Sequence, residues 1–176
     1  MRKGAEIIPA MAAHIPAIAA NVRAADREEL WAAGRRTPLD CMFHGLDCSD
    51  KAWTGLMDGE PVCMFGCVPA SILGNVGRPW MVGTRLLDRH PLVFLRRCKG
   101  HVREMAERFD RLENYVDARN LRAMAWLAWL GFEICEPVRI GPYKREFYRF
   151  EMARLATLPP PAPPKLGGEP LFPLLV

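Results

Sequence analysis

Long apolar runs are absent from this sequence of 176 residues. The longest apolar stretch, residues 123–130, contains Trp126 and Trp129 and is far shorter than the roughly 20 residues of a membrane-spanning helix. The opening segment from Met1 to Pro9 is also too short to hold the apolar core of a signal peptide. These absences predict a soluble protein that is not exported and has no membrane partner.

Cysteine is sparse: the chain has six, too few for a disulfide framework in a protein of this length. The nearest approach to a metal-binding pattern is Cys41-x2-His44-x3-Cys48, with Cys63-x3-Cys67 further along. Zinc sites usually contain two short ligand pairs, and neither segment supplies a clean pair. Cys63 and Cys67 also fall in a strand-like run, where a spacing of four places both on one face. We therefore predict buried free thiols in a reducing compartment and no metal.

An excess of one charge is also nearly absent, because 24 lysines and arginines oppose 20 acidic residues and leave a net charge of +4. So small an excess permits an acidic partner but does not require one. Half of the residues are hydrophobic and a quarter are charged, so the chain can bury an ordinary core and wholesale disorder is excluded. The length corresponds to one domain, with room for a tail.

The first part of the chain predicts one strand followed by two helices. Residues 6–9 form a short strand-like run. Apolar residues at three- and four-residue steps from Ile15 predict a helix that ends at Gly34. Thr37 followed by Pro38 indicates the start of a second, short helix.

The rest of the chain predicts a mixed sheet with further helices. The dipeptide Asp58-Gly59 between two apolar runs is the clearest turn signal, because a tight hairpin needs positive φ angles. In chain order the predicted elements are strands at 53–57, 60–68 and 80–84, a helix at 91–109, a strand at 112–117, a helix from Asn120 to Leu130 that ends at Gly131, and strands at 133–140 and 146–152. This order predicts an α/β (α+β) fold with helices on the faces of a mixed sheet.

The composition changes after Leu158, where seven of the 16 prolines follow. Residues 158–176 favour extended polyproline conformation, so we expect them to stay outside the packed domain of residues 1–157. Two interpretations of this tail stay open: a disordered end, or a docking peptide for another protein. The apolar side chains that would bind such a partner are Leu171, Phe172, Leu174, Leu175 and Val176.

The segment from Asn120 to Phe132 combines an Asn cap, an Ala at position 123 and the closing sequence Leu130-Gly131-Phe132. This pattern resembles the late helix of the GNAT N-acetyltransferase superfamily. The order of the predicted elements is also the GNAT order, over about residues 5–152. The resemblance implies a GNAT-like, mostly antiparallel sheet flanked by helices, and acetyl-CoA as the cofactor of any enzymatic activity.

Three parts that the resemblance implies for catalysis have no counterpart in this chain. GNAT enzymes hold the acetyl-CoA pyrophosphate on a glycine-containing loop, where this chain has Asp88, Pro91 and no glycine. Many members carry a general-acid Tyr seven residues after the Asn cap, and here that position is Leu127. The strand at 80–84, where the family often carries its general base, has no carboxylate or His. These differences predict a domain that has lost acetyl transfer.

Site residues can nevertheless be named for an enzyme. Glu113 and Asp117 are candidates for the general base, with exposed strand polar residues as the competing interpretation. Acetyl-CoA would be held by Arg89, Arg96 and Asn120 in place of the missing loop.

Acidic residues also cluster on the first predicted helix, at Asp26, Glu28 and Glu29. Arg23 and Arg27 accompany them, and such mixed clusters are typical of a salt-linked surface. We therefore predict that this cluster is solvated surface, although it lies near the place where acceptor amines enter GNAT enzymes.

A second, narrower resemblance is consistent with the absence of the three catalytic features. The string from Phe109 to Asn120, the hairpin at 59–66 and the strand at 79–84 resemble a small internal virion protein family of short-tailed bacteriophages, which carries a degenerate GNAT-like domain. Membership implies a phage or prophage protein, in the virion or in the bacterial cytoplasm during assembly. Its partners would be capsid, portal, tail or internal virion proteins. Our main expectation is therefore an assembly component that uses no cofactor.

Two alternatives stay open. One is an acetyl-CoA-dependent N-acyltransferase with an atypical pyrophosphate-binding loop. The other is a module that contacts nucleic acid, including DNA, through the basic face of the 91–109 helix, where Arg96, Lys99 and Arg103 share one side. Glu104 and Glu107 interrupt that face and no aromatic residues are interleaved for base stacking, so a solvated helix face is the competing interpretation.

Overall fold

The computed structural model describes residues 4–71, 73–89 and 91–154, so the tail at 158–176 lies outside the described residues. Its elements in chain order are β1 (Ala5–Pro9), η1 (Ala12–His14), α1 (Ile15–Ala20), α2 (Ala24–Gly34), α3 (Pro38–Cys48), β2 (Lys51–Met57), β3 (Glu60–Ser71), β4 (Val76–Gly83), η2 (Leu87–Arg89), α4 (Pro91–Arg108), β5 (Arg111–Asp117), α5 (Leu121–Leu130), β6 (Glu133–Ile140) and β7 (Arg145–Ala153). Within these ranges, no helix combines the length and the apolar character that crossing a lipid bilayer requires.

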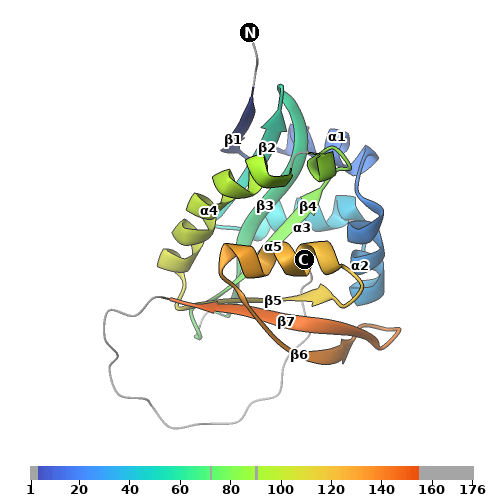
Figure 1. Ribbon diagram of the computed structural model, residues 1–176, viewed down its shortest axis with the longest axis vertical. Helices are drawn as coiled ribbons and strands as arrows, with labels where there is room; N and C mark the ends of the chain where they lie inside the picture. The colour runs from blue at the N-terminus through green and yellow to red at the C-terminus, as the bar shows by residue number, and fades with distance from the viewer. Residues whose placement is uncertain (1–3, 72, 90, 155–176) are drawn as a thin grey trace.

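The seven strands form one sheet in the order β1-β2-β3-β4-β5-β7-β6 (Figure 1). Neighbouring strands pair in antiparallel fashion, except that β4 and β5 run parallel. The helix α4 provides the crossover that a parallel pair requires. The predicted fold class, a mixed and mostly antiparallel sheet flanked by helices, is confirmed.

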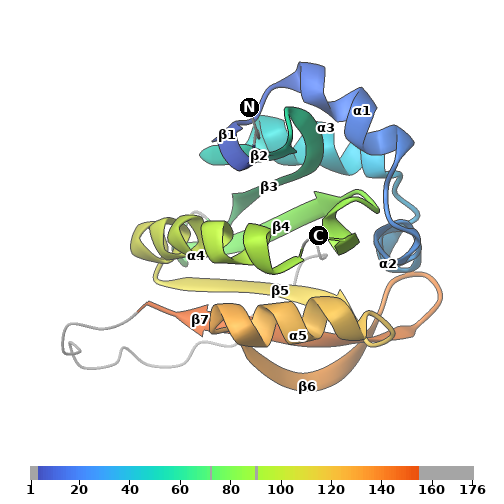
Figure 2. The same cartoon turned by 45° about the horizontal axis from the view of Figure 1, so that its top comes forward.

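Alternation along β3 divides its side chains between two cores. Cys63, Phe65 and Cys67 join the core under α4 and α5, whereas Met64 joins the core under α1 and α3. The two groups of helices lie apart in Figure 2, with α4 and α5 running along β4 and β5. The prediction that Cys63 and Cys67 share one buried face is confirmed.

The predicted single helix from 15 to 34 is wrong, because the chain forms α1 and α2 with a break between them. Val22 bridges to Thr84, and the Arg23 N–H donates a 3.0 Å hydrogen bond to the Gly83 carbonyl. This pairing with the end of β4, which is distant in sequence, interrupts the helix. The spacing of apolar residues between Ile15 and Gly34 does not predict the interruption. The break directs one face of α2 toward the end of β4.

The predicted turn and cap residues are confirmed. Asp58 (φ 52°) and Gly59 (φ 91°) both have positive φ at the tip of the β2–β3 hairpin. Asn120 caps α5, since its Oδ1 accepts a 3.2 Å hydrogen bond from the Ala123 N–H. Gly131 ends α5 with φ of 104°, the left-handed conformation that glycine favours.

Candidate functional site

The sheet opens between its two parallel strands. β4 and β5 pair only near their beginnings, where Val76 faces Arg111 and Gly77 faces Leu112. Beyond these pairs the opening holds a cavity of about 130 Å³, whose lining also includes residues of α2, α4 and α5. The C-terminal ends of parallel strands are a common place for ligands in sheets of this kind.

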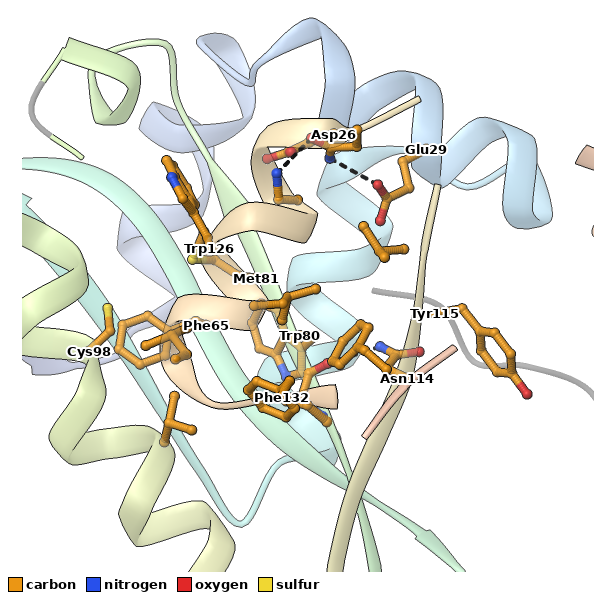
Figure 3. Close-up of a pocket in the computed structure, with 18 of the residues that line it drawn as sticks. Asp26, Glu29, Phe65, Trp80, Met81, Cys98, Asn114, Tyr115, Trp126 and Phe132 are labelled. Carbon is orange, nitrogen blue, oxygen red and sulfur yellow. Dashed lines mark hydrogen bonds between the residues drawn. The ribbon is translucent and has the colours of Figure 1, made fainter. Parts of the chain in front are cut away.

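Apolar side chains make most of the cavity wall (Figure 3). They include Phe65, Cys98, Met105, Trp126, Leu127 and Phe132. Polar side chains lie chiefly on the α2 side, where Arg23, Asp26, Glu29 and Asn120 line the cavity. The cavity is therefore an apolar slot with an ionisable end.

The edge of β4 is unpaired inside this slot. Hydrogen bonds at the residues two before and two after Met81 show which way the polar backbone groups of β4 point. The Pro79 carbonyl oxygen accepts from Asn114 Nδ2, and the Gly83 N–H donates to Asp26 Oδ2. Because backbone direction alternates with period two along a strand, the N–H and C=O of Met81 face the same way, toward β5. Among the described residues they have no hydrogen-bond partner. An unpaired strand edge is a template for another extended chain.

Asn114 lines the slot and carries a second unpaired group. Its side chain is 1% exposed, and its Nδ2 donates a 2.9 Å hydrogen bond to the Pro79 carbonyl. Its Oδ1 is buried without a partner among the described residues. A buried acceptor without a donor costs roughly 1–3 kcal/mol, so a ligand N–H placed here would be bound favourably.

The α2 end of the slot is built on a buried ion pair. Arg23 donates from Nε and Nη2 to the Asp26 carboxylate at distances of 2.7 to 3.1 Å, and both residues are less than 10% exposed. The Arg23 guanidinium also lies 5.1 Å from the centre of the Trp126 ring. Burial raises the pKa of Asp26, while Arg23 and the Gly83 N–H oppose that rise. These contacts hold the pair rigidly at the end of β4.

Glu29 is the second buried carboxyl at this end of the slot. It is 4% exposed, and Asn120 Nδ2 donates a 3.0 Å hydrogen bond to its Oε2. Burial raises its pKa to about 8, opposed by the Asn120 hydrogen bond and assisted by the negative charge of Asp26. A carboxyl that titrates near neutral pH inside a cavity is suited to proton transfer.

The prediction that the acidic cluster is solvated surface is therefore wrong for two of its three members. Asp26 and Glu29 are buried, and only Glu28 is exposed. Positions 26, 29, 30 and 33 share one face of α2, so both carboxyls lie on the stripe that carries the buried Leu30 and Ala33. The three-residue spacing between Asp26 and Glu29 is the sequence signal of their burial, and it outweighs their charge.

An ion-pair network joins η2 to α5 and to Arg23, which lines the slot. Asp88 lies 2.7 Å from Arg122 at the start of α5 and 3.5 Å from Arg23. The connection at 84–90 contains no glycine, the residue that most readily lets a backbone approach phosphate closely. Arg89 and Arg96, the predicted cofactor ligands, are both exposed near the start of α4 and do not line the slot.

The two predicted bases lie outside the slot lining. Glu113 pairs with Arg111 at 3.1 Å and with Arg149 at 3.6 Å on the sheet. Asp117 is buried, and hydrogen bonds from Arg119 hold its pKa below the usual value against the effect of burial. Of the predicted site residues, the structure brings only Asn120 into the slot. The predicted partner-binding residues Leu171, Phe172, Leu174, Leu175 and Val176 lie outside the described residues.

Four of the six cysteines are buried free thiols, as predicted, whereas Cys48 is exposed and Cys135 is half-buried. Burial raises the pKa of Cys41 to about 11 and that of Cys98 to about 12, so these thiols are protonated at neutral pH. Cys48 Sγ lies 3.6 Å from His44 Nδ1. In residues 4–71, 73–89 and 91–154, no group of three or more His, Cys, Asp and Glu side chains is arranged to hold a metal ion.

Comparison with known proteins gives a match at the level of structure alone. No protein-family model matches the chain, and no curated protein matches its sequence. A ribosomal-protein-alanine N-acetyltransferase from Brucella melitensis superposes with a TM-score of 0.66 at 15% identity, over 84% of this chain and 99% of that one. A GCN5-related N-acetyltransferase from Kribbella flavida gives 0.65 at 16% identity, over 85% and 98%. A spermidine N-acetyltransferase from Vibrio cholerae, in complex with CoA and spermine, gives 0.59 at 9% identity, over 85% and 95%.

These three structures are acetyltransferases by name, and they share the GNAT-like fold expected from sequence. Nothing in the comparisons indicates a virion or phage role, so that part of the sequence-based expectation is not shown. The superpositions establish the architecture. Because the identities are only 9–16%, the activity has to be argued from the site. The chain has the fold of the GNAT acetyltransferases.

Proposed function

We propose that this chain is an N-acyltransferase that binds acyl-CoA in the slot between β4 and β5 and transfers its acyl group to an amine. The observation that carries the proposal is the slot itself, where an unpaired strand edge at Met81 and an unpaired acceptor at Asn114 face an apolar cavity. The CoA bound to the spermidine acetyltransferase neighbour supports the choice of donor.

The slot fits the pantetheine arm of CoA, which is extended, largely apolar and interrupted by amides. The Met81 backbone pairs with such an amide as it would pair with an added strand. Asn114 Oδ1 accepts a hydrogen bond from an amide N–H. The apolar wall, which includes Trp126 and Leu127, excludes water and strengthens both hydrogen bonds.

The diphosphate of CoA does not fit the glycine-loop mode of binding. Asp88 stands where phosphate oxygens would approach, and the connection at 84–90 lacks glycine. This connection itself contains two exposed cations, Arg85 and Arg89, and Arg122 already reaches Asp88 from α5. Side-chain ion pairs of this kind are weak in water, so we expect affinity for CoA to depend strongly on salt.

Acyl-CoA supplies a thioester as the acyl donor, so the reaction forms a C–N bond and breaks a C–S bond. In its ionised form, Glu29 accepts the proton that the amine loses, because it is the carboxyl of the slot whose pKa lies near 8. Asn120 holds the Glu29 carboxylate in place through its 3.0 Å hydrogen bond.

The CoA thiolate can leave without a general acid at position 127 to protonate it. An alkyl thiol has a pKa of roughly 8.5, so its thiolate leaves readily and takes a proton from water. Leu127 contributes to the apolar wall and donates no proton, which is compatible with this route.

The first test is calorimetric titration of the whole chain with acetyl-CoA and with CoA. We expect binding in the micromolar range, and weaker binding by Asn114→Leu, which removes the buried acceptor while leaving the wall apolar. The control is Asn21→Ala at an exposed side chain that bonds only within α1, with urea unfolding to verify that both variants fold. No heat at millimolar ligand would leave the domain as a scaffold without a cofactor, the main expectation from sequence.

A further inference from the structure

A larger concavity, of about 850 Å³, lies on the outer side of α2. Its volume falls within the range of small-ligand pockets. Its wall comes from α2, the start of α3, the β5–α5 connection and the turn between β6 and β7. We call it the α2 groove; the residues that matter here are Arg27, Trp31, Arg36, Arg119, Tyr143 and Arg145.

Two aromatic rings stand exposed in the α2 groove. Trp31 is 51% exposed and Tyr143 is 44% exposed, although both are large side chains that proteins usually cover. The Arg35 guanidinium lies 5.4 Å from the centre of the Tyr143 ring. Exposed rings beside guanidinium groups are typical of surfaces on which nucleobases stack.

The two rings are held on a rigid support. Ala32 and Ala33, which follow Trp31 on α2, are buried against the β6–β7 side of the sheet. The backbone of Gly141 approaches α2 so closely that an added Cβ would lie 2.2 Å from the Ala32 carbonyl oxygen. The distance between the Trp31 and Tyr143 platforms is therefore fixed by backbone contact.

Unpaired positive charge surrounds the rings. Arg27, Arg36 and Arg145 have no ion-pair partner within 4 Å among the described residues. Arg119 is already occupied by Asp117, and its Nη1 lies 3.5 Å from Glu28, the carboxylate that lines the groove. Arg36 hydrogen-bonds to the Cys41 side chain and interacts electrostatically with Asp40, and Arg145 interacts electrostatically with Asp117. Within the described part of the chain, none of the three guanidinium groups is held in an ion pair, and their planar donor geometry is suited to phosphate.

We propose that the α2 groove binds nucleotides, with Trp31 and Tyr143 stacking against bases and Arg27, Arg36 and Arg145 binding phosphates. The ligand chemistry is a planar base joined to phosphate, which free nucleotides and single-stranded nucleic acid share. The site differs from the basic face of α4 considered from sequence, and it does not depend on acyl transfer.

The test is fluorescence anisotropy of a labelled single strand of roughly 16 nucleotides, titrated with the whole chain. Three phosphate contacts predict a slope of log Ka against log salt of about −2. We expect Trp31→Ala to weaken binding by about 5- to 100-fold and Trp31→Phe to retain most of it. Arg36→Gln should reduce the slope by about 0.7.

The matched control is Trp129→Ala on α5. Trp129 is 44% exposed and lies 5.1 Å from the Lys99 ammonium, so it offers a ring beside a cation at a different surface. We expect no change in affinity for this variant. If Trp129→Ala weakens binding while Trp31→Ala does not, nucleic acid binds at α4 and α5 and the proposal is overturned.

Competition identifies the source of the ligand. Displacement by millimolar ATP assigns free nucleotides, and displacement by unlabelled single strands alone assigns nucleic acid; both outcomes support the proposal. Equal displacement by polyglutamate would mean that the groove attracts any polyanion, and it would overturn the proposal, as would absence of binding at low salt. Urea unfolding of each variant verifies that a loss of affinity is not a loss of fold.

Discussion

Asn120 Nδ2 donates a hydrogen bond to Glu29 Oε2 across 3.0 Å and so joins the cap of α5 to the buried face of α2. The same side chain accepts from Ala123 N–H through Oδ1, which leaves the amide satisfied at both ends. One residue therefore begins a helix and positions the buried carboxyl that we propose as the base.

Glu29→Gln should change how stability depends on pH. The pKa of Glu29 rises from 4.5 to about 8 on folding, so the folded protein binds this proton more tightly than the unfolded chain. Between these values stability falls as pH rises, by up to about 1.4 kcal/mol per pH unit. The variant lacks this term and should be more stable than the wild type at pH 8, measured by urea unfolding at pH 5 and pH 8.

Glu28→Gln is the control for that measurement, since Glu28 is the adjacent residue and its side chain is 64% exposed. The control should follow the wild type at both pH values. Asp26, whose pKa burial also raises, is present in all three proteins and does not affect the difference between them. Parallel pH profiles for the wild type and Glu29→Gln would contradict the burial cost assigned to Glu29.

The rate of acyl transfer should also follow Glu29. With an amine acceptor, kcat/KM should rise with pH and level off above about 8, where Glu29 is ionised and can accept a proton. Glu29→Gln should lower kcat by about 10²- to 10⁴-fold with little change in the Kd for acetyl-CoA. A normal rate in this variant would show that another group takes the proton, while the proposed reaction itself would stand.

Replacement by alanine should lower the stability of the protein at one glycine and raise it at another. Gly141 has φ of 74°, and its Cβ would lie 2.2 Å from the Ala32 carbonyl oxygen, so Gly141→Ala should destabilise the protein by about 1–3 kcal/mol. Gly100 lies within α4 with nothing within 4 Å of an added Cβ, so Gly100→Ala should stabilise it by roughly 0.5–1 kcal/mol. Thermal unfolding compares the two, and a stable Gly141→Ala protein would show that the turn is free to move away from α2.

Removal of residues 158–176 should leave the free energy of unfolding unchanged. Among the residues that the structure describes, the cores are made by side chains between Ala5 and Met152, and β7 ends at Ala153. Urea midpoints of the whole and the shortened chain should agree. A lower midpoint for the shortened chain would place part of the tail against the domain and would contradict the division at residue 157.

Local signals predicted much of the fold. The Asp58-Gly59 turn, the Asn120 cap and the Gly131 stop each depend on neighbours in sequence, and each is present in the structure. The boundary inside the first helix was missed because Val22 pairs with Thr84, a contact that no local pattern encodes.

The site was harder to predict than the fold. The connection at 84–90 has no glycine and position 127 is Leu, but neither fact tells whether a slot exists. The slot arises because β4 and β5 stop pairing after Gly77, and the loss of pairing has no signature in either strand alone. Glu29 was misjudged because its partner Asn120 is distant in sequence.

The opening in the sheet also divides the molecule along the order of the chain. β1 to β4 precede α4 and β5 to β7 follow it, and across the division the strands share only the two pairs at Val76 and Gly77. Each half supplies one wall of the slot, and neither half contains a complete binding surface. The complete slot therefore exists only when the two consecutive segments on either side of α4 are packed together.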